Sequence, residues 1–154
     1  MSAKQTDHQS KSMKELKEVS LQTKIVEITF DEFKLEKSIK SGIKFNFDQF
    51  QYEFNISIDV NKVKGELSVN LTVNIFSDLE KKNKLGYITS HGIFLVVNFN
   101  EVIINDKIPN VILANFIGVL ISTTRGFLIV KAQGTPIEGA IIPIVTPNSF
   151  FGKK

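Results

Sequence analysis

The chain has 154 residues, of which 42% are hydrophobic and 23% charged, with 19 basic and 16 acidic side chains. This length suits one domain with its own core, and this balance excludes a chain that is disordered throughout. Cysteine is absent, which excludes a disulfide framework or a thiolate metal site and fits a cytoplasmic setting. Residues 1–20 are polar and lack the apolar segment of a signal peptide, so we expect a flexible arm before a single domain over 21–154.

Alternating apolar and polar residues predict four strands. The first, within 24–38, changes step once, which indicates a bulge near Asp31–Glu32. Residues 51–61 and 66–76 alternate strictly around a short turn, and we expect a hairpin with one apolar face. Residues 87–100 are apolar on both faces, which is typical of a central strand.

The stretch 109–126 is apolar almost throughout, and its small and polar residues recur at spacings of three and four. These residues are Ala114, Asn115, Gly118, Ser122 and Arg125. That spacing predicts a helix, which Pro109–Asn110 would begin and Arg125–Gly126 would end. The stretch falls short of the about 20 residues that cross a bilayer, so we expect no membrane span.

The prolines near the C-terminus restrict the secondary structure of that region. Pro136, Pro143 and Pro147 forbid a long regular helix near the C-terminus, while 127–132 fits either a short strand or an extension of the helix.

A helix with one narrow polar stripe must bury most of its surface, and one sheet face covers only one side. We expect self-association through the helix; the alternative is a monomer in which the C-terminal tail covers it. The expected interface residues are Ile112, Phe116, Ile117, Leu120 and Ile121.

Residues with catalytic chemistry are sparse. His8 lies in the polar arm, and His91 lies in the strand 87–100 without a nucleophile at a recognisable spacing. Neither a histidine pair nor a glycine-rich phosphate loop is present, so we expect that the protein is not an enzyme and that it binds no metal and no cofactor.

Phenylalanine is the most informative residue type, with 13 copies and no tryptophan. Aromatic residues crowd between Phe45 and Phe54, and such patches usually bind an apolar partner. With Lys40 and Lys44 they could also stack bases, so a single-stranded nucleic-acid-binding module stays an alternative, ranked lower because acidic residues share the patch. A carrier whose helix lines a cavity for a lipid or small ligand is a further alternative.

Four short motifs within 86–151 resemble the SecB family of bacterial export chaperones. In chain order they are Gly92-Ile93-Phe94, Pro109-Asn110, Thr124-Arg125-Gly126 and Pro143-Ile144-Val145. The resemblance implies an α+β fold, a four-stranded antiparallel sheet with a long helix packed on one face and an irregular C-terminal segment. It also implies a cytoplasmic, ATP-independent holdase, assembled as a dimer of dimers, that keeps unfolded or precursor polypeptides competent for the Sec translocation pathway. Related SecB-like proteins instead serve the antitoxin of a toxin–antitoxin system, and that role is an alternative.

Non-native polypeptides would then lie along an apolar groove. We expect this client-binding groove at Phe45, Phe47, Phe50, Tyr52, Ile142, Val145, Phe150 and Phe151. In the family, the sheet face that docks the translocation motor carries carboxylates, whereas here it offers amides and hydroxyls. These are Asn55, Ser57, Ser68, Asn70, Thr72 and Asn74, with the carboxylates Asp59 and Glu66 only near the turn. The second long helix of the better-known members is missing or shortened, so the Sec motor is a less secure partner than the client.

Overall fold

The computed structural model describes residues 20–39, 43, 45–46 and 49–152. Its elements are β1 (Thr23–Leu35), β2 (Gln51–Asn61), β3 (Glu66–Phe76), β4 (Lys84–Val96), α1 (Phe99–Val102), α2 (Asn110–Lys131) and the 3-10 helix η2 (Pro147–Phe151). The arm expected over 1–20 lies outside the described residues, apart from Ser20.

The four strands form one antiparallel sheet in the order β1-β4-β3-β2. The predicted α+β class, the β2–β3 hairpin and the central place of β4 are therefore confirmed. Strand β1 pairs with β4 along one edge, and its register shifts at Val26 and at Asp31. The second shift is the bulge that the sequence predicts. The first was not expected, because Val26 still fits the alternation of its neighbours.

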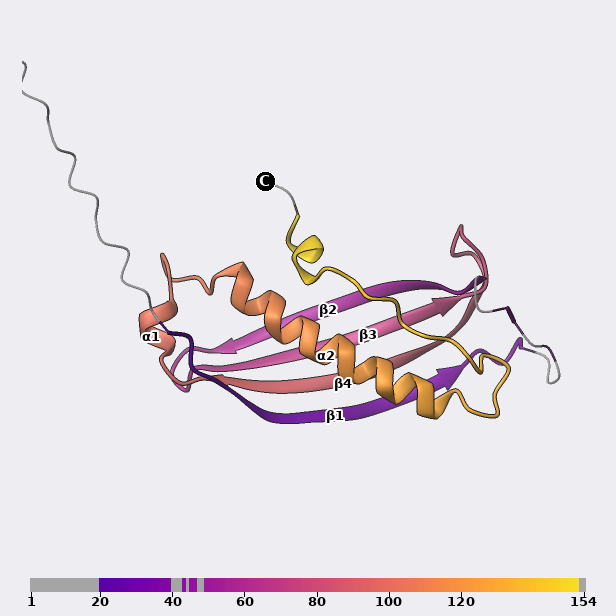
Figure 1. Cartoon of the computed structure of the whole chain (residues 1–154), viewed down its shortest axis with the longest axis horizontal. Coiled ribbons are helices and arrows are strands. Elements are labelled where there is room, and N and C mark those ends of the chain that lie inside the picture. The colour runs from indigo at the N-terminus through magenta and orange to yellow at the C-terminus, as the bar shows by residue number, and fades with distance from the viewer. Residues whose placement is uncertain (1–19, 40–42, 44, 47–48, 153–154) are drawn as a thin grey trace, which may run out of the picture.

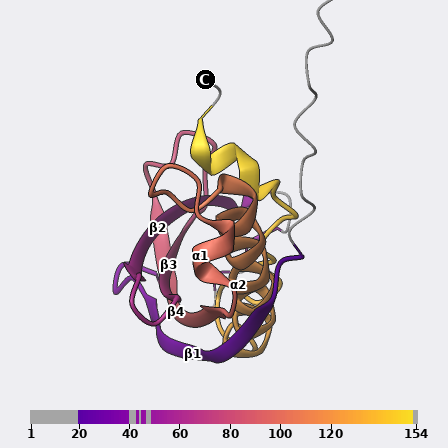
Figure 2. The same cartoon turned by 90° about the vertical axis from the view of Figure 1, so that its left-hand side faces the viewer.

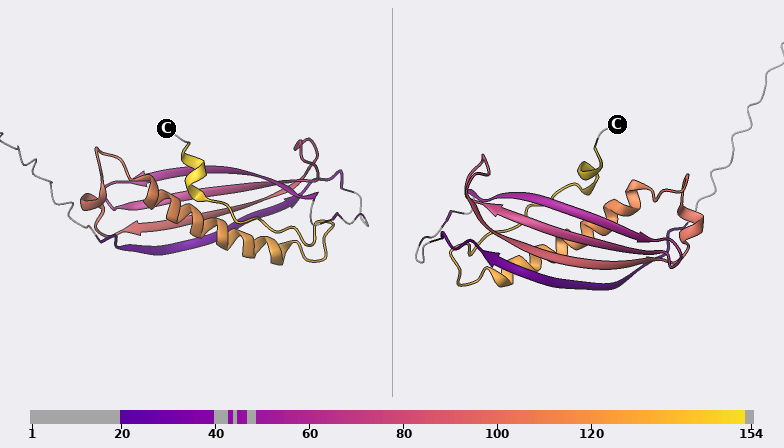
Figure 3. Two further views of the ribbon diagram at one scale, coloured as in Figure 1. Left: turned by 45° about the horizontal axis from the view of Figure 1, so that its top comes forward. Right: turned by 180° about the vertical axis from the view of Figure 1, so that it is seen from behind.

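All the other elements that cover the sheet lie on one face. Helix α2 crosses this face diagonally, and the C-terminal segment runs back beside it over β2 and β3 (Figure 1). Seen end-on, the sheet curls around α2 (Figure 2). Seen from behind, the opposite face, here called the outer face, carries no helix in the described part of the chain (Figure 3). Alternate residues of β3 point to the covered face and are buried: Leu67, Val69, Leu71, Val73 and Ile75.

A pair of buried hydroxyl groups fixes α2 over β4. The side-chain oxygens of Ser90 and Thr124 are 2.5 Å apart, and Thr124 donates to the carbonyl of Leu120 at 2.7 Å. Since a hydroxyl has one hydrogen, Ser90 donates to Thr124. Both polar groups are thereby satisfied inside an apolar layer, where an unpaired group would cost about 1–3 kcal/mol.

The fourth strand ends earlier than the sequence predicts. Strand β4 stops at Val96, and the expected continuation to residue 100 instead turns at Val97–Asn98 into α1. The side chain of Asn98 donates to the carbonyl of Ser20 at 2.8 Å, which ties this turn to the chain entering β1. Phe99 is buried at the end of the sheet rather than in a strand.

Helix α2 also differs from the prediction at both ends. Pro109 is the N-cap and Asn110 is already helical, so Asn110 does not cap the helix. The helix continues past Gly126 to Lys131, which settles 127–132 as an extension. A helical glycine costs up to about 1 kcal/mol, and complete burial of Leu128 in the next turn contributes about 1.5–3 kcal/mol. Burial therefore outweighs the glycine.

The full length of α2 changes the expectation about membranes. With 22 residues, it is the one helix in the described part of the chain that is long and apolar enough to cross a bilayer. The prediction that this segment is too short was therefore wrong. A core helix of a soluble protein passes the same test, and α2 packs one side against the sheet.

The residues expected at a subunit interface are buried within their own chain. The five side chains are between 0 and 5% exposed: Ile112, Phe116, Ile117, Leu120 and Ile121. The ring of Phe116 stacks on Phe94 of β4 with centroids 4.5 Å apart. This is a correction at the level of residues, because the sheet curls around α2 and covers the wider part of its apolar surface. What remains for another copy is the opposite side of the helix, where Val111, Ile129 and Val130 are exposed.

Candidate functional site

The C-terminal segment over 141–151, here called the strap, lies beside α2 on the covered face of the sheet (Figure 1). It has no regular structure up to Thr146 and then forms η2. The sequence predicts this course, because Pro143 and Pro147 cannot donate a backbone hydrogen bond and hold the chain extended. The strap thus lies as an extended apolar chain between a helix and the edge strand β2.

Arg125 of α2 holds the middle of the strap. Its Nε donates to the carbonyl of Ile142 at 2.6 Å, and its Nη2 donates to the carbonyl of Pro143 at 2.9 Å. Charge-assisted bonds of this kind are about twice as strong as neutral ones. Gly118, two turns earlier on α2, allows close approach of Pro147, because a Cβ at this position would lie 3.2 Å from the proline Cγ.

Side chains of the strap point into the space between α2 and β2. Ile142 is fully buried, and Phe150 meets Phe54 edge-on with ring centroids 5.7 Å apart. Tyr52 lies farther along β2, and burial of its ring raises its pKa to about 12, against a smaller opposite contribution from the Ile141 backbone N–H. The strap therefore desolvates the inward side of β2 as a packed core would.

The predicted groove residues fall into two groups. Phe50, Tyr52 and the four strap residues, Ile142, Val145, Phe150 and Phe151, belong to one apolar layer on the covered face. Phe45 packs against Phe50 with centroids 6.2 Å apart, but it also lines a separate cavity of about 540 Å³ with Ile129 and Pro136 near the end of α2. Phe47 lies outside the described residues. The expected open trough is thus largely filled by the strap of the same chain.

An open groove continues the line of the strap toward the start of α2. Its volume is about 370 Å³. Its lining is mostly apolar, with Ile58, Val60, Ile108 and Leu113, and the polar and charged residues of the lining are Lys62, Asp106, Lys107 and Asn110. Val60 is 40% exposed. The ion pair between Lys62 and Asp106, 3.2 Å apart, joins the β2–β3 turn to the loop before α2. We call the strap-filled space and this groove together the apolar cleft.

The alternation of β2 indicates part of the open groove in the sequence itself. Ile58 and Val60 belong to the apolar alternation of β2, in step with Tyr52 and Phe54. Tyr52 to Val60 covers eight residue steps of extended chain, or roughly 26 Å. The sequence could not show that Leu113 also lines the groove, because its approach to the end of β2 depends on the diagonal course of α2.

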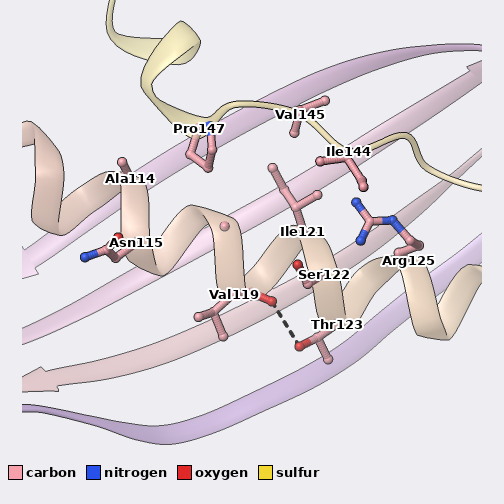
Figure 4. Close-up of a pocket in the computed structure, with 11 residues that line it drawn as sticks. Ala114, Asn115, Val119, Ile121, Ser122, Thr123, Arg125, Ile144, Val145 and Pro147 are labelled. Atoms are coloured by element: carbon pink, nitrogen blue, oxygen red, sulfur yellow. Dashed lines mark hydrogen bonds between the residues drawn. The ribbon is translucent and has the colours of Figure 1, made fainter.

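The polar stripe of α2 borders a second groove, between the helix and the outer side of the strap (Figure 4). Its volume is about 660 Å³. Asn115 and Ser122 face water here, while Ile144 of the strap is 93% exposed. The small and polar residues of the stripe therefore face the strap and solvent, while the largest apolar residues of the helix are buried within the chain.

The outer face of the sheet offers hydrogen-bonding groups and no enclosure. Ser68 and His91 form a 2.7 Å hydrogen bond between Oγ and Nε2 on this face. Tyr87 donates to Glu32 at 2.8 Å, and this bond raises the pKa of Tyr87. Among the described residues, no group of three or more His, Asp or Glu side chains could hold a metal ion. Within the part of the chain that the structure describes, the Ser68–His91 pair has no third group bonded to the imidazole that would orient it as in a catalytic triad.

Comparison with known proteins supports this architecture at the level of fold. The sequence matches no family model, and no curated protein matches it. One similar solved structure is the Mycobacterium tuberculosis Rv1957 SecB-like chaperone, in complex with a ChAD peptide from the Rv1956 HigA1 antitoxin. The match has a TM-score of 0.57 at 9% identity and covers 80% of this chain and 89% of that chain. The chain therefore has a SecB-like fold, as its short motifs predict.

Proposed function

We propose that the protein is a cytoplasmic, ATP-independent chaperone that holds extended apolar segments of non-native polypeptides in the apolar cleft. The observation that carries this proposal is the open groove lined by Ile58, Val60, Ile108 and Leu113. This groove continues a track on which an extended apolar chain already lies. Burial of apolar side chains needs no nucleotide and no catalytic group, so the proposal also implies that the protein is not an enzyme.

Aggregation of an unfolding client tests this proposal. The wild type should suppress light scattering by heat-unfolded citrate synthase without nucleotide. Val60→Ser should weaken this suppression several-fold, because each methyl group that the client no longer buries costs about 1 kcal/mol of binding free energy. Val63→Ser is the matched control, since Val63 is 97% exposed at the tip of the β2–β3 turn, outside the cleft. Equal activity of the two variants would remove the cleft assignment, and an inactive wild type would remove the function.

Two roles are compatible with this proposal, and they differ in the kind of client that the protein binds. The neighbour's bound antitoxin peptide favours a chaperone dedicated to an antitoxin, whereas the short motifs favour delivery of precursors to the Sec translocation pathway. The outer face of the sheet bears on the second role, because Asn70, Thr72 and Asn74 stand where the family's motor-docking carboxylates are expected. A toxin–antitoxin pair adjacent in the genome would favour the first role.

Self-association, expected as a dimer of dimers, is part of the same proposal. Apolar side chains remain exposed on the edge strand β1, where Ile25 and Val26 are each 57% exposed, and on α2, where Val130 is 64% exposed. An edge strand with free backbone groups and apolar side chains is a ready site for pairing with another copy.

A further inference from the structure

The strap occupies the same apolar cleft that we assign to a client, and this inference rests on that proposed function. Its chemistry is that of a client segment: extended, apolar and interrupted by prolines. Four of its side chains pack on the core: Ile142, then Val145 three residues later, then Phe150 five residues after that, with Phe151 next to it. Ile141 and Ile144, by contrast, are 52% and 93% exposed. The strap therefore shows which pattern of side chains the cleft accepts.

The backbone–backbone hydrogen bonds that hold the strap are few and local. Within the described residues, the backbone–backbone bonds of this region are confined to its two ends, from Ala140 to the carbonyl of Ile137 and from Ser149 to the carbonyl of Thr146. The two bonds from Arg125 hold the middle. A segment without ladder hydrogen bonds to the sheet can leave while the sheet and α2 stay folded, because local openings follow such weakly bonded units.

We propose that the strap is a built-in occupant of the cleft which a client must displace. Client segments that share its anchor pattern compete best: two aliphatic side chains three residues apart, followed five residues later by an aromatic ring. Displacement breaks no covalent bond. It exchanges the contacts of Ile142 and Phe150 for equivalent contacts of the client, and it releases Arg125 to bond the backbone of the incoming chain.

A reversible cross-link tests this displacement. In Gly118→Cys/Pro147→Cys, the two residues already approach, since a Cβ on Gly118 would lie 3.2 Å from the Cγ of Pro147. The Cβ of residue 147 is one bond from that Cγ, so a separation of about 3.8 Å between the two Cβ atoms, as in a disulfide, is within reach. The native chain has no cysteine, so only one disulfide can form within it. Oxidation should weaken binding of reduced, carboxymethylated α-lactalbumin at least about tenfold, because the open population is removed. Reduction should restore it.

A second probe separates the strap from the client. A fluorescent peptide with the sequence of residues 140–152 should bind the reduced protein and not the oxidised one. A control peptide with Asn in place of Ile142 and Phe150 should bind neither. Arg125→Gln, in an otherwise native chain, should speed hydrogen exchange of the strap amides about tenfold, since loss of the two charge-assisted bonds raises the open population. Its affinity for the first peptide should change little, because the bound peptide loses the same two bonds.

Each outcome decides between the two proposals. Equal binding of α-lactalbumin in the oxidised and reduced states overturns the strap proposal and leaves the chaperone function standing. No client binding by the wild type, with peptide binding restricted to the reduced state, overturns the chaperone function and supports displacement of the strap. If the peptide binds neither state, hydrogen exchange of the strap amides decides: equal rates in both states show a strap that does not open, and faster exchange after reduction supports one that does.

Discussion

At the scale of single residues, the two tyrosines report the two faces of the sheet. Tyr52 is half-buried under the strap, and Tyr87 lies on the outer face beside Glu32. The sequence places them on strands of strict alternation, which correctly indicates that Tyr52 faces inward. It could not show what covers Tyr52, because the strap arrives from about 90 residues away along the chain.

The titration of Tyr52 is a direct test of that cover. In Tyr87→Phe, the single remaining tyrosine should ionise near pH 12, as absorbance near 295 nm measures without interference from tryptophan, which the chain lacks. The unfolded chain loses this proton near pH 10, while the folded chain keeps it. The free energy of unfolding should therefore fall as the pH rises from about 10 to about 12. Tyr52→Phe should abolish this component, and ordinary ionisation near pH 10 in Tyr87→Phe would contradict the burial.

At the scale of elements, the periodicity of the sequence predicted those features that depend on contacts between residues close together in the chain. The four strands, the bulge at Asp31 and the existence of α2 follow from patterns within about a dozen residues. The ends of β4 and α2 do not, because they depend on contacts across the fold. Asn98 turns the chain through its bond to Ser20, and Leu128 carries the helix past Gly126 by packing on the core. The free energy of burying an apolar side chain therefore outweighs a local signal such as a glycine that would end the helix.

Two glycines in α2 and β4 should respond oppositely to alanine. At Gly92 a Cβ would lie 2.7 and 2.9 Å from ring atoms of Phe94, which is fully buried and stacked on Phe116 and cannot yield. Gly92→Ala should destabilise the protein by about 1–3 kcal/mol. At Gly126 nothing lies within 4 Å of the added Cβ, so Gly126→Ala should stabilise by about 0.5–1 kcal/mol through helix propensity alone. Urea unfolding measures both, and a destabilised Gly126→Ala would indicate that this helix side is covered.

At the scale of the whole molecule, the sequence predicted a surplus of apolar surface but misplaced part of it. The side of α2 with the largest apolar residues is covered by the curled sheet, and the strap covers one flank. The remaining surplus lies on β1 and on the opposite side of α2, at Val119 and Val130 among others. Sheet curvature and the diagonal course of α2 decide this distribution, and neither is encoded in a periodic pattern.

Assembly can be tested on that remaining surface. Val119→Glu/Val130→Glu should convert an oligomer into a monomer in sedimentation velocity, with an unchanged circular dichroism spectrum, because both side chains already contact water, at 36% and 64% exposure. Leu120→Glu, one residue away, should instead unfold the chain, since it places an unpaired carboxylate at a fully buried site. A monomeric wild type would exclude association through α2.

The covalent continuity of the strap with α2 has a consequence for selectivity. A tethered competitor acts at an effective concentration in the millimolar range for a short connection, so a weak or brief contact with a passing protein cannot win the site. Folded proteins expose few extended segments and would be turned away at this threshold. Long unfolded chains, which offer many segments in succession, would pass it.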